Sequence, residues 1–575
     1  MFRDHPYLCI VAALSALCLS SIAVVSELHS DPSAPVFFSR TSLVLVPTVV
    51  TDKMGNHLTG LTRGDFQILE DNKDERIAIF EETNTSSGAI RRVDPNDAGF
   101  SNVVAPDSKA QRLTLIVLDT LNTRFADQVH ARRELVRFID ETLQPGEAVA
   151  ILTIGSNGLS VVNDFTTDPK VLSAAVKKVR SEPSQEERIA PPETDPPLSQ
   201  RLAKTLGYGP RSLDEIADKL DEFQGAAFDR FEQLQQANNV EITLMALRQI
   251  AESFAGIPGR KSLILATGGL PFITDDPTSF SFRTERLLAA YESTWSALNH
   301  AQIAVYPLDM GGLFNPGFVS ARFGKPVHYR RMVDSVGNLE TMARKTGGRR
   351  CEYKMSLSGC FSASLKDESQ YYLLGYYSDS SKGRMGWRKL DVSTHRANAV
   401  VEARDGYYVS PKPHDAKKAA SDDMNVAITS PVDFTSVPML VRWTGRTAQG
   451  VNTRLSFRFN VPGTGFTIDR TNQNEISLAF AAFAKVSANT AAGEFVKDLE
   501  GKLSDETVEN IIKQGIVYDG ALDVPAGKYS VRFIVRDNLS GRIGTVTVPL
   551  EVEKGATTTS TVTSPAQSGS RPTVQ

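Results

Sequence analysis

Residues 113–119, LTLIVLD, form a continuous apolar run that ends in a carboxylate. Such a run predicts a buried parallel strand whose polar end lies at the carboxyl edge of a sheet, where open α/β folds bind their ligands. Similar runs at 147–156, 261–269 and 302–309 alternate with helical patterns. We therefore expect residues 111–369 to form an α/β domain, a doubly wound sheet with helices on both faces.

Two flanking segments, residues 36–83 and 370–409, alternate like short strands. The first contains about four strands, which are too few for a core of their own. We expect the two segments to pair into one β domain into which the α/β domain is inserted. Residues 84–110 lack periodicity and are rich in polar and turn residues, so they are expected to be a linker.

The C-terminal part divides into three segments. Residues 410–423 are expected to be a linker because they begin with Pro411 and Pro413. Residues 424–553 contain short strand patterns separated by turns, beginning with MNVAIT at 424–429, and predict a β-sandwich-like domain. One amphipathic helix is expected near residues 495–514. Residues 554–575 have the composition of a disordered tail.

The N-terminal segment differs from the rest of the chain. Arg3 precedes an apolar run from Tyr7 to Val25, with small residues before Glu27. This pattern predicts a signal peptide over residues 1–26 and an exported protein, in the periplasm, the cell envelope or outside the cell. The alternative is an uncleaved anchor, because the run is nearly long enough to span a membrane.

Charge and cysteine content narrow the function classes. The chain has 63 Lys+Arg against 67 Asp+Glu, which gives no basic surplus for nucleic acid. Outside the predicted signal peptide, the only cysteines are Cys351 and Cys360. In an oxidising compartment their short separation predicts one disulfide, and two buried free thiols are the alternative.

Several sequence pieces occur together in a fixed order. They are VVTDKMGNHLTGLTRGDFQILED, LIVLDTLNT, VNDFTTD, IPGRKSLILATGG, AQIAVYPLDMGGL, KTGGR, QYYLLGYY and VEARDGYY, over residues 40–409. In this ordered set the chain resembles von Willebrand factor type A domains, and more closely the exported bacterial proteins called von Willebrand type A-related, described mainly from Acidobacteria. The resemblance implies a Rossmann-like sheet and leaves the C-terminal unit uncovered.

The resemblance also implies a metal ion-dependent adhesion site, which uses D-x-S-x-S after the first strand, a loop Thr and a later Asp. Mg²⁺ prefers such oxygen ligands and leaves a position for a partner's carboxylate. Two positions depart from the pattern, since Leu121 replaces the first hydroxyl and Gly268 or Gly269 replaces the later Asp. The candidate ligands in this chain are Asp119, Asn122, Thr123, Thr166, Thr167 and Asp309.

A structural interpretation of the same residues stays open. Asp119 can cap the helix that is expected to start near Thr123, and Asp309 can order its own loop. Asp164 and Asp168 are also typical turn and cap residues.

Enzyme motifs are absent from the sequence. It has no H-E-x-x-H, no P-loop, no G-x-G-x-x-G and no G-x-S-x-G after a strand. We therefore expect a non-enzymatic adhesion, binding or scaffold protein with a protein partner and a degenerate metal site, contacting a membrane only through an uncleaved N-terminus. The alternatives are a metal-free structural envelope component and an exported hydrolase with an interdomain site.

Overall fold

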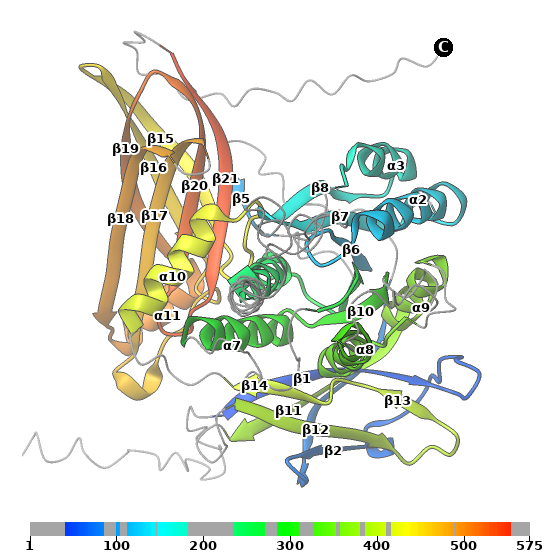
Figure 1. The fold of residues 1–575 in the computed structure, drawn as a ribbon. Helices are drawn as coiled ribbons and strands as arrows, with labels where there is room; N and C mark the ends of the chain where they lie inside the picture. Colours follow the sequence, from blue (N-terminus) through cyan, green and yellow to red (C-terminus); the bar gives the residue numbers. More distant parts are fainter. Residues whose placement is uncertain are drawn as a thin grey trace, which may run out of the picture. The chain divides into compact units, whose positions relative to one another are not determined.

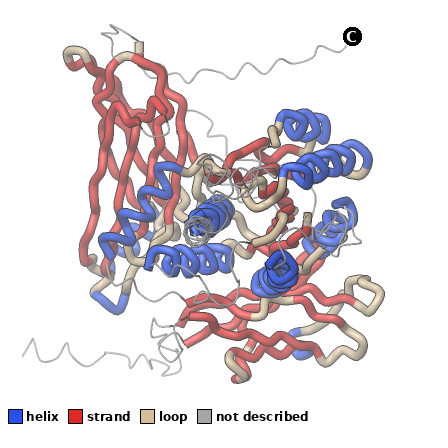
Figure 2. The backbone as a smooth tube through the Cα atoms, viewed as in Figure 1, coloured by secondary structure: helices blue, strands red, loops and turns tan. Residues whose placement is uncertain are grey.

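A computed structural model describes residues 41–85, 99–103, 112–144, 146–181, 234–235, 237–270, 285–310, 327–351, 357–379, 386–409, 416–487 and 490–553. Figure 1 labels the elements, and Figure 2 shows how much of the chain is strand. The predicted signal peptide, residues 182–233 and the predicted C-terminal tail lie outside these residues. None of the helices within the described ranges has the length and apolar content needed to cross a membrane.

The central unit is a five-stranded mixed sheet. Its strands are β6 (Leu113–Asp119), β7 (Ala148–Gly155), β8 (Gly158–Thr166), β9 (Lys261–Thr267) and β10 (Ile303–Asp309), in the order β10-β9-β6-β7-β8. The four strands from β10 to β7 run parallel, and β8 returns antiparallel to β7 through a tight hairpin. Every residue of β6 is buried.

Helices cover both sides of this sheet because alternate residues of β6 enter two different hydrophobic clusters. Leu115 and Val117 pack with α7 (Glu285–His300), α8 (Val327–Thr346) and the helix at 237–254. Ile116 and Leu118 pack with α2 (Phe125–Glu141), α3 (Pro169–Lys178) and α9 (Leu357–Ser369). The apolar run of β6 is thus explained by burial on two faces.

The fold class expected from the sequence is wrong. Among the residues that the structure describes, strand predominates, with 46% strand and 30% helix, and the strands form five separate sheets instead of being organised around one Rossmann-like doubly wound sheet. The strand–helix alternation describes only part of the chain. It also missed β8, whose antiparallel direction comes from a hairpin at 155–158 that leaves no room for a crossover helix.

Strands from the two flanking segments pair with each other. β11 (Gln370–Asp379) lies between β1 (Thr41–Thr51) and β4 (Ile77–Asn84), and β13 (Val400–Glu402) pairs with β1. In a second sheet, β12 (Gly386–Thr394) lies between β2 (Phe66–Glu70) and β14 (Gly406–Val409), and β3 (Lys73–Glu75) completes the edge. One hydrophobic cluster joins both sheets, so each segment supplies the core that the other lacks.

Two antiparallel sheets in the C-terminal part share one apolar core. One has the order β19-β16-β15-β5 and the other β18-β17-β20-β21. Their bounds are β5 (Phe100–Ser101), β15 (Leu440–Gln449), β16 (Asn452–Val461), β17 (Glu475–Ser487), β18 (Thr490–Lys502), β19 (Ile516–Pro525), β20 (Gly527–Asp537) and β21 (Ile543–Val552). Strand β5 comes from the stretch that the sequence presented as a linker, and it pairs with β15.

Of two local expectations in this part, one is wrong and the other is confirmed only in its C-terminal half. The strand expected at 424–429 is the end of helix α10 (Ala416–Thr429), which begins inside the expected linker 410–423. The helix expected at 495–514 is strand β18 followed by the shorter helix α11 (Asp505–Gln514). Ser504 caps α11 by accepting a hydrogen bond from the Thr507 amide, so this cap marks where the helix begins.

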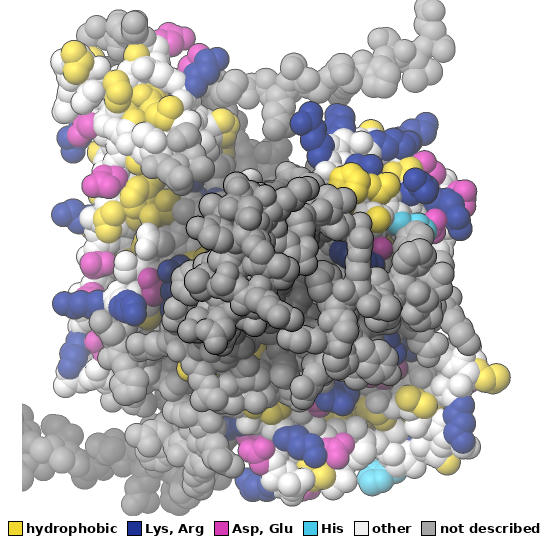
Figure 3. All heavy atoms as spheres, viewed as in Figure 1, with side chains coloured by type: hydrophobic (Ala, Val, Ile, Leu, Met, Phe, Trp, Pro, Cys, Tyr) yellow, Lys and Arg dark blue, Asp and Glu magenta, His cyan; other side chains and the backbone are white. Residues whose placement is uncertain are grey.

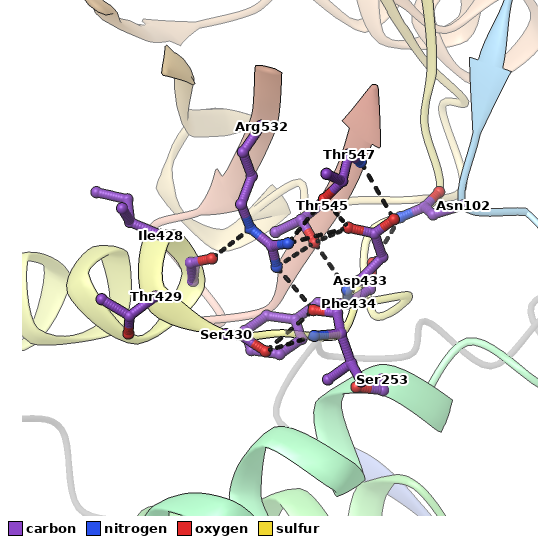
Figure 4. Close-up of polar contacts among 12 residues, drawn as sticks. Asn102, Ser253, Ile428, Thr429, Ser430, Asp433, Phe434, Arg532, Thr545 and Thr547 are labelled. Atoms are coloured by element: carbon purple, nitrogen blue, oxygen red, sulfur yellow. Dashed lines mark hydrogen bonds and ion pairs between the residues drawn. The ribbon is translucent and has the colours of Figure 1, made fainter. Parts of the chain in front are cut away.

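Arg532 on β20 fastens the end of α10 and the following loop to the C-terminal sheets (Figure 4). Its side chain is 3% exposed and donates to Asp433 Oδ1 at 3.1 Å and to the Thr545 and Thr547 hydroxyls at 2.9 and 2.8 Å. It also donates to the backbone carbonyls of Ala427 and Val432. The guanidinium therefore has acceptors around its whole planar fork, which is what a buried arginine needs.

Candidate functional site

Asp119 ends β6 at the carboxyl edge of the mixed sheet. Its register partner on β7 is Ile154, and Thr267 closes the neighbouring strand β9. Thr267 in turn pairs with Asp309 on β10. The structure therefore places Asp119, Thr267 and Asp309 in one row across three adjacent strand ends.

The Asp119 carboxylate is 2% exposed and accepts four hydrogen bonds from its own surroundings. Its Oδ1 accepts from the amides of Leu121 and Asn122 at 3.1 and 3.0 Å. Its Oδ2 accepts from Asn122 Nδ2 at 2.9 Å and from the Thr267 hydroxyl at 2.6 Å. A carboxylate offers about four lone-pair positions, so these donors occupy its accepting capacity.

Burial sets the protonation behaviour of Asp119. Loss of solvent raises the pKa of its carboxyl, and the hydrogen bonds from Thr267, Asn122 and Leu121 oppose that rise because they favour the charged form. The carboxylate is thus held by dipoles, with no described cation paired to it.

The loop after β6 is turned toward the protein interior. Leu121 is 3% exposed and packs in the cluster on one side of the sheet. Asn122 directs its amide nitrogen at Asp119 and at the Thr243 hydroxyl, 3.1 Å away. The Thr123 hydroxyl accepts from the Gly268 amide at 2.7 Å. Asn122 thus turns its amide nitrogen, which cannot ligate a cation, toward Asp119, and the Thr123 hydroxyl is engaged by the opposite loop.

Gly268 stands where the resemblance places a later Asp. A Cβ at this position would lie 2.7 Å from the Asn122 carbonyl oxygen and 3.0 Å from the Thr123 Cα. The close approach of the two loops therefore requires glycine here. The same approach brings the Gly268 amide to the Thr123 hydroxyl.

Thr166 and Thr167 lie at the other end of the sheet. Thr166 pairs with Val149, and Val149 pairs with Thr114, five residues before Asp119 on β6. At about 3.3 Å per residue this separates Thr166 from the Asp119 edge by roughly 16 Å. The expectation that either threonine joins Asp119 at a metal is therefore wrong, because the hairpin at 155–158 reverses the chain before it reaches them.

The residues present do not fit Mg²⁺ at this edge. The lone pairs of the Asp119 carboxylate are occupied, Leu121 and Gly268 have no side-chain ligand atom, and Thr166 and Thr167 are remote. In the portion of the chain that the structure covers, no three His, Cys, Asp or Glu side chains are grouped to hold a metal. Asp309 and Asp119 are separated by the intervening strand β9, with Thr267 between them.

The sequence analysis missed a buried ionic cluster at the amino end of the same sheet. Arg260 directly precedes β9, which begins at Lys261, and Asp367 and Glu368 lie in the last turn of α9, just before β11. Arg260 donates to Tyr306 Oη at 2.9 Å, and Tyr306 donates to Asp367 Oδ2 at 2.8 Å. The sequence carries a signal for this cluster. Two basic residues precede an apolar strand, and two acidic residues end a helical stretch.

The pKa values of Lys261 and Glu368 both lie far from their usual ranges. Burial lowers the pKa of Lys261 to about 7, against the opposing charge of Glu368. Burial raises the pKa of Glu368 to about 8, against hydrogen bonds from Ser262 and the charge of Arg260. Perturbed pKa values accompany many active sites. Here both side chains are at most 1% exposed, so a substrate cannot reach them in this conformation.

A groove of about 680 Å³ opens between the β7–β8 hairpin and α3. Hydroxyl and amide side chains line it from the hairpin, and Lys178 and Arg180 line it at the end of α3. Figure 3 shows Lys and Arg side chains over the region of α2 and α3, with hydrophobic side chains between them. The sequence analysis did not identify this groove, because it required β8.

Cys351 and Cys360 form a disulfide, with their Cα atoms 5.4 Å apart. Both are buried in the cluster that joins α2, α3 and α9 to the sheet. The bridge connects the stretch after α8 to α9, so it fixes the beginning of α9 against the sheet.

Comparisons with known proteins identify no family for this chain. A scan against protein-family models finds no match, and a search of curated proteins finds none either.

Proposed function

We propose that this chain is an exported, non-enzymatic binding or scaffold protein that engages a protein partner without a metal at the Asp119 edge. The observation that carries the proposal is the set of four hydrogen bonds to the Asp119 carboxylate. Through these bonds, Asp119 connects the loop after β6 to the end of β9. They also leave its carboxylate no free lone pair for a cation.

Export and family membership belong to the same proposal. The apolar run before Glu27 supports export, and the ordered motifs over residues 40–409 support a relationship to the exported von Willebrand type A-related group. The two alternatives of different class remain a structural envelope component and a hydrolase.

Metal binding is tested by calorimetric titration of Mg²⁺ and Mn²⁺ into the metal-stripped chain from Glu27 onward, beside Asp119→Asn. We expect no saturable heat from either protein at millimolar cation. Saturable binding that Asp119→Asn removes would overturn the metal-free assignment.

Catalysis is tested on the same preparation with ester, glycoside, peptide and phosphoester substrates. We expect no turnover. An activity that tracks the purified protein and is lost on Glu368→Gln or Lys261→Met would replace the binding proposal with the hydrolase.

A further inference from the structure

Strand β8 is an edge strand, and only its β7 side is paired among the described strands. An edge strand presents unpaired N–H and C=O groups and can accept an added strand. Val161 on β8 is 40% exposed and Val171 on α3 is 45% exposed, so apolar side chains lie on both sides of this edge. These features favour an extended peptide as the ligand.

The groove beside β8 gives that peptide a charge preference. Ser160 and Asn163 on β8 line one wall, and Lys178 and Arg180 lie at the end where α3 finishes. No acidic residue in the described ranges forms an ion pair with either cation. Lys177, by contrast, pairs with Asp140 at 3.6 Å, away from the groove. Lys178 and Arg180 therefore both line the groove without an acidic partner in the described ranges.

The residues that line the groove include two cations and no acid, and the nearest acidic residues along the chain lie outside this lining. Asp164 and Asp168 lie where β8 runs into α3, and Asp168 caps the helix by accepting from the Lys170 amide at 2.9 Å. The cations lie at the opposite end of α3. The acidic residues of a ligand are therefore attracted to the end of the groove near Lys178 and Arg180.

We propose that an acidic, extended segment of a partner protein binds here, adding a strand to β8 and directing its carboxylates at Lys178 and Arg180. This inference rests on the proposed binding function and names its partner surface. Alternate residues of an added strand point to opposite faces. Acidic residues therefore face the groove while their apolar neighbours face Val161.

The probe is a fluorescein-labelled ten-residue peptide of alternating Glu and Val, titrated against the chain from Glu27 onward by fluorescence anisotropy. We expect saturable binding that weakens about tenfold or more in Lys178→Glu/Arg180→Glu, as expected for reversal of two interfacial charges. Lys177→Glu is the matched control, because it changes the same helix turn outside the groove, and it should leave binding unchanged. A peptide of alternating Lys and Val should not bind.

Strand addition is tested separately from charge. A Glu-Val peptide with N-methyl groups on alternate residues keeps its carboxylates but loses the N–H donors that pair with a strand. We expect it to bind far more weakly than the parent peptide. Equal binding of the N-methylated peptide would leave only charge attraction and overturn the strand-addition proposal.

Other outcomes also overturn the proposal. These are no saturation by about 1 mM peptide, or binding that the double variant does not change. A chain that dimerises and becomes monomeric in Lys178→Glu/Arg180→Glu would assign the groove to a second copy. Each of these leaves the metal-free binding function standing, because that function is judged by the cation titration and the substrate panel.

Discussion

The two ends of the mixed sheet each bury a carboxyl group, and they treat it differently. At the carboxyl end, Asp119 accepts four hydrogen bonds between 2.6 and 3.1 Å from the loop after β6 and from Thr267. At the amino end, Glu368 is 0% exposed, and the Thr114 hydroxyl is 3.5 Å from its Oε2. Burial raises the pKa of both, but the donors opposing it are closer and more numerous at Asp119.

This difference teaches how a buried acid is used. Asp119 serves as a fixed acceptor that ties two loops together, and its geometry leaves no place for a cation. Glu368 has a pKa of about 8 and exchanges its proton near neutral pH. The first residue should therefore matter for stability at any neutral pH, and the second should make stability depend on pH.

Removing the Asp119 acceptor should have the largest effect. Asp119→Ala leaves the amides of Leu121 and Asn122 without their acceptor and moves the Thr267 hydroxyl to the Gly269 carbonyl, 2.9 Å away, so it should lower the free energy of unfolding by about 3–4 kcal/mol. Asp119→Asn keeps one acceptor oxygen and should cost about half as much. Urea unfolding at pH 7 measures both. Equal and small losses of unfolding free energy in the two variants would mean that these hydrogen bonds do not stabilise the loop after β6.

Glu368 should give a pH-dependent contribution. Its pKa rises from 4.5 to about 8 on folding, so its stabilising contribution is fully present below pH 4.5 and is lost as the pH rises toward 8. Between pH 5 and 7 the expected loss is on the order of 2–3 kcal/mol, at about 1.4 kcal/mol per pKa unit. Lys261, whose pKa burial lowers to about 7, begins to lose its proton in the folded state near pH 7 and therefore offsets less than about 0.5 kcal/mol of that loss.

The measurement is urea unfolding of the wild-type chain and Glu368→Gln at pH 5 and pH 7. The variant cannot ionise at this position, so its stability should fall less between the two pH values. Identical pH slopes for the two proteins would show that Glu368 titrates normally.

Gly268→Ala tests the close approach of the two loops at the Asp119 edge. Its new Cβ would lie 2.7 Å from the Asn122 carbonyl oxygen, so we expect a loss of about 2 kcal/mol from overpacking. Gly501→Ala on β18 is the control, because a Cβ there meets nothing within 4 Å. Thermal unfolding compares the two variants, and a similar melting temperature for both would argue against the tight approach.

Thr166→Val should have the smallest effect. The Thr166 hydroxyl accepts from the exposed Asp168 amide at 3.2 Å, and a surface change of this kind typically alters stability by less than about 0.5 kcal/mol. The variant should also leave the response to Mg²⁺ unchanged. A changed cation titration would contradict the register that places Thr166 at the amino end of the sheet.

Sequence reasoning was most informative where the apolar residues allowed few ways of burying a segment. The apolar run at 113–118 required burial on two faces, and its final carboxylate fixed a polar group at a strand end. The small size of 36–83 and 370–409 led to the expectation that they pair, and β11 does lie between β1 and β4. Both inferences depend on burial requirements that the chain carries in its own residues.

Sequence reasoning was least informative where contacts with other segments determine the local secondary structure. Residues 424–429 are apolar enough for a strand, yet Ala427 enters a cluster as part of α10, which is fastened by Arg532. Residues 100–103 have the composition of a linker, but Asn102 Nδ2 donates to the Phe434 carbonyl (Figure 4) and to the Val437 carbonyl. Its Oδ1 accepts from the Met439 amide, and these bonds place β5 beside β15. Neither contact has a local signal.

The sequence by itself determined that Asp119 ends a buried strand and that Leu121 and Gly268 supply no metal ligand. Only the tertiary structure decided that four donors occupy Asp119, that Thr166 and Thr167 lie at the opposite end of the sheet, and that β8 offers an edge beside Lys178 and Arg180. The physical reason is that burial is encoded residue by residue. Register, strand direction and hydrogen-bond partners depend on which segments meet.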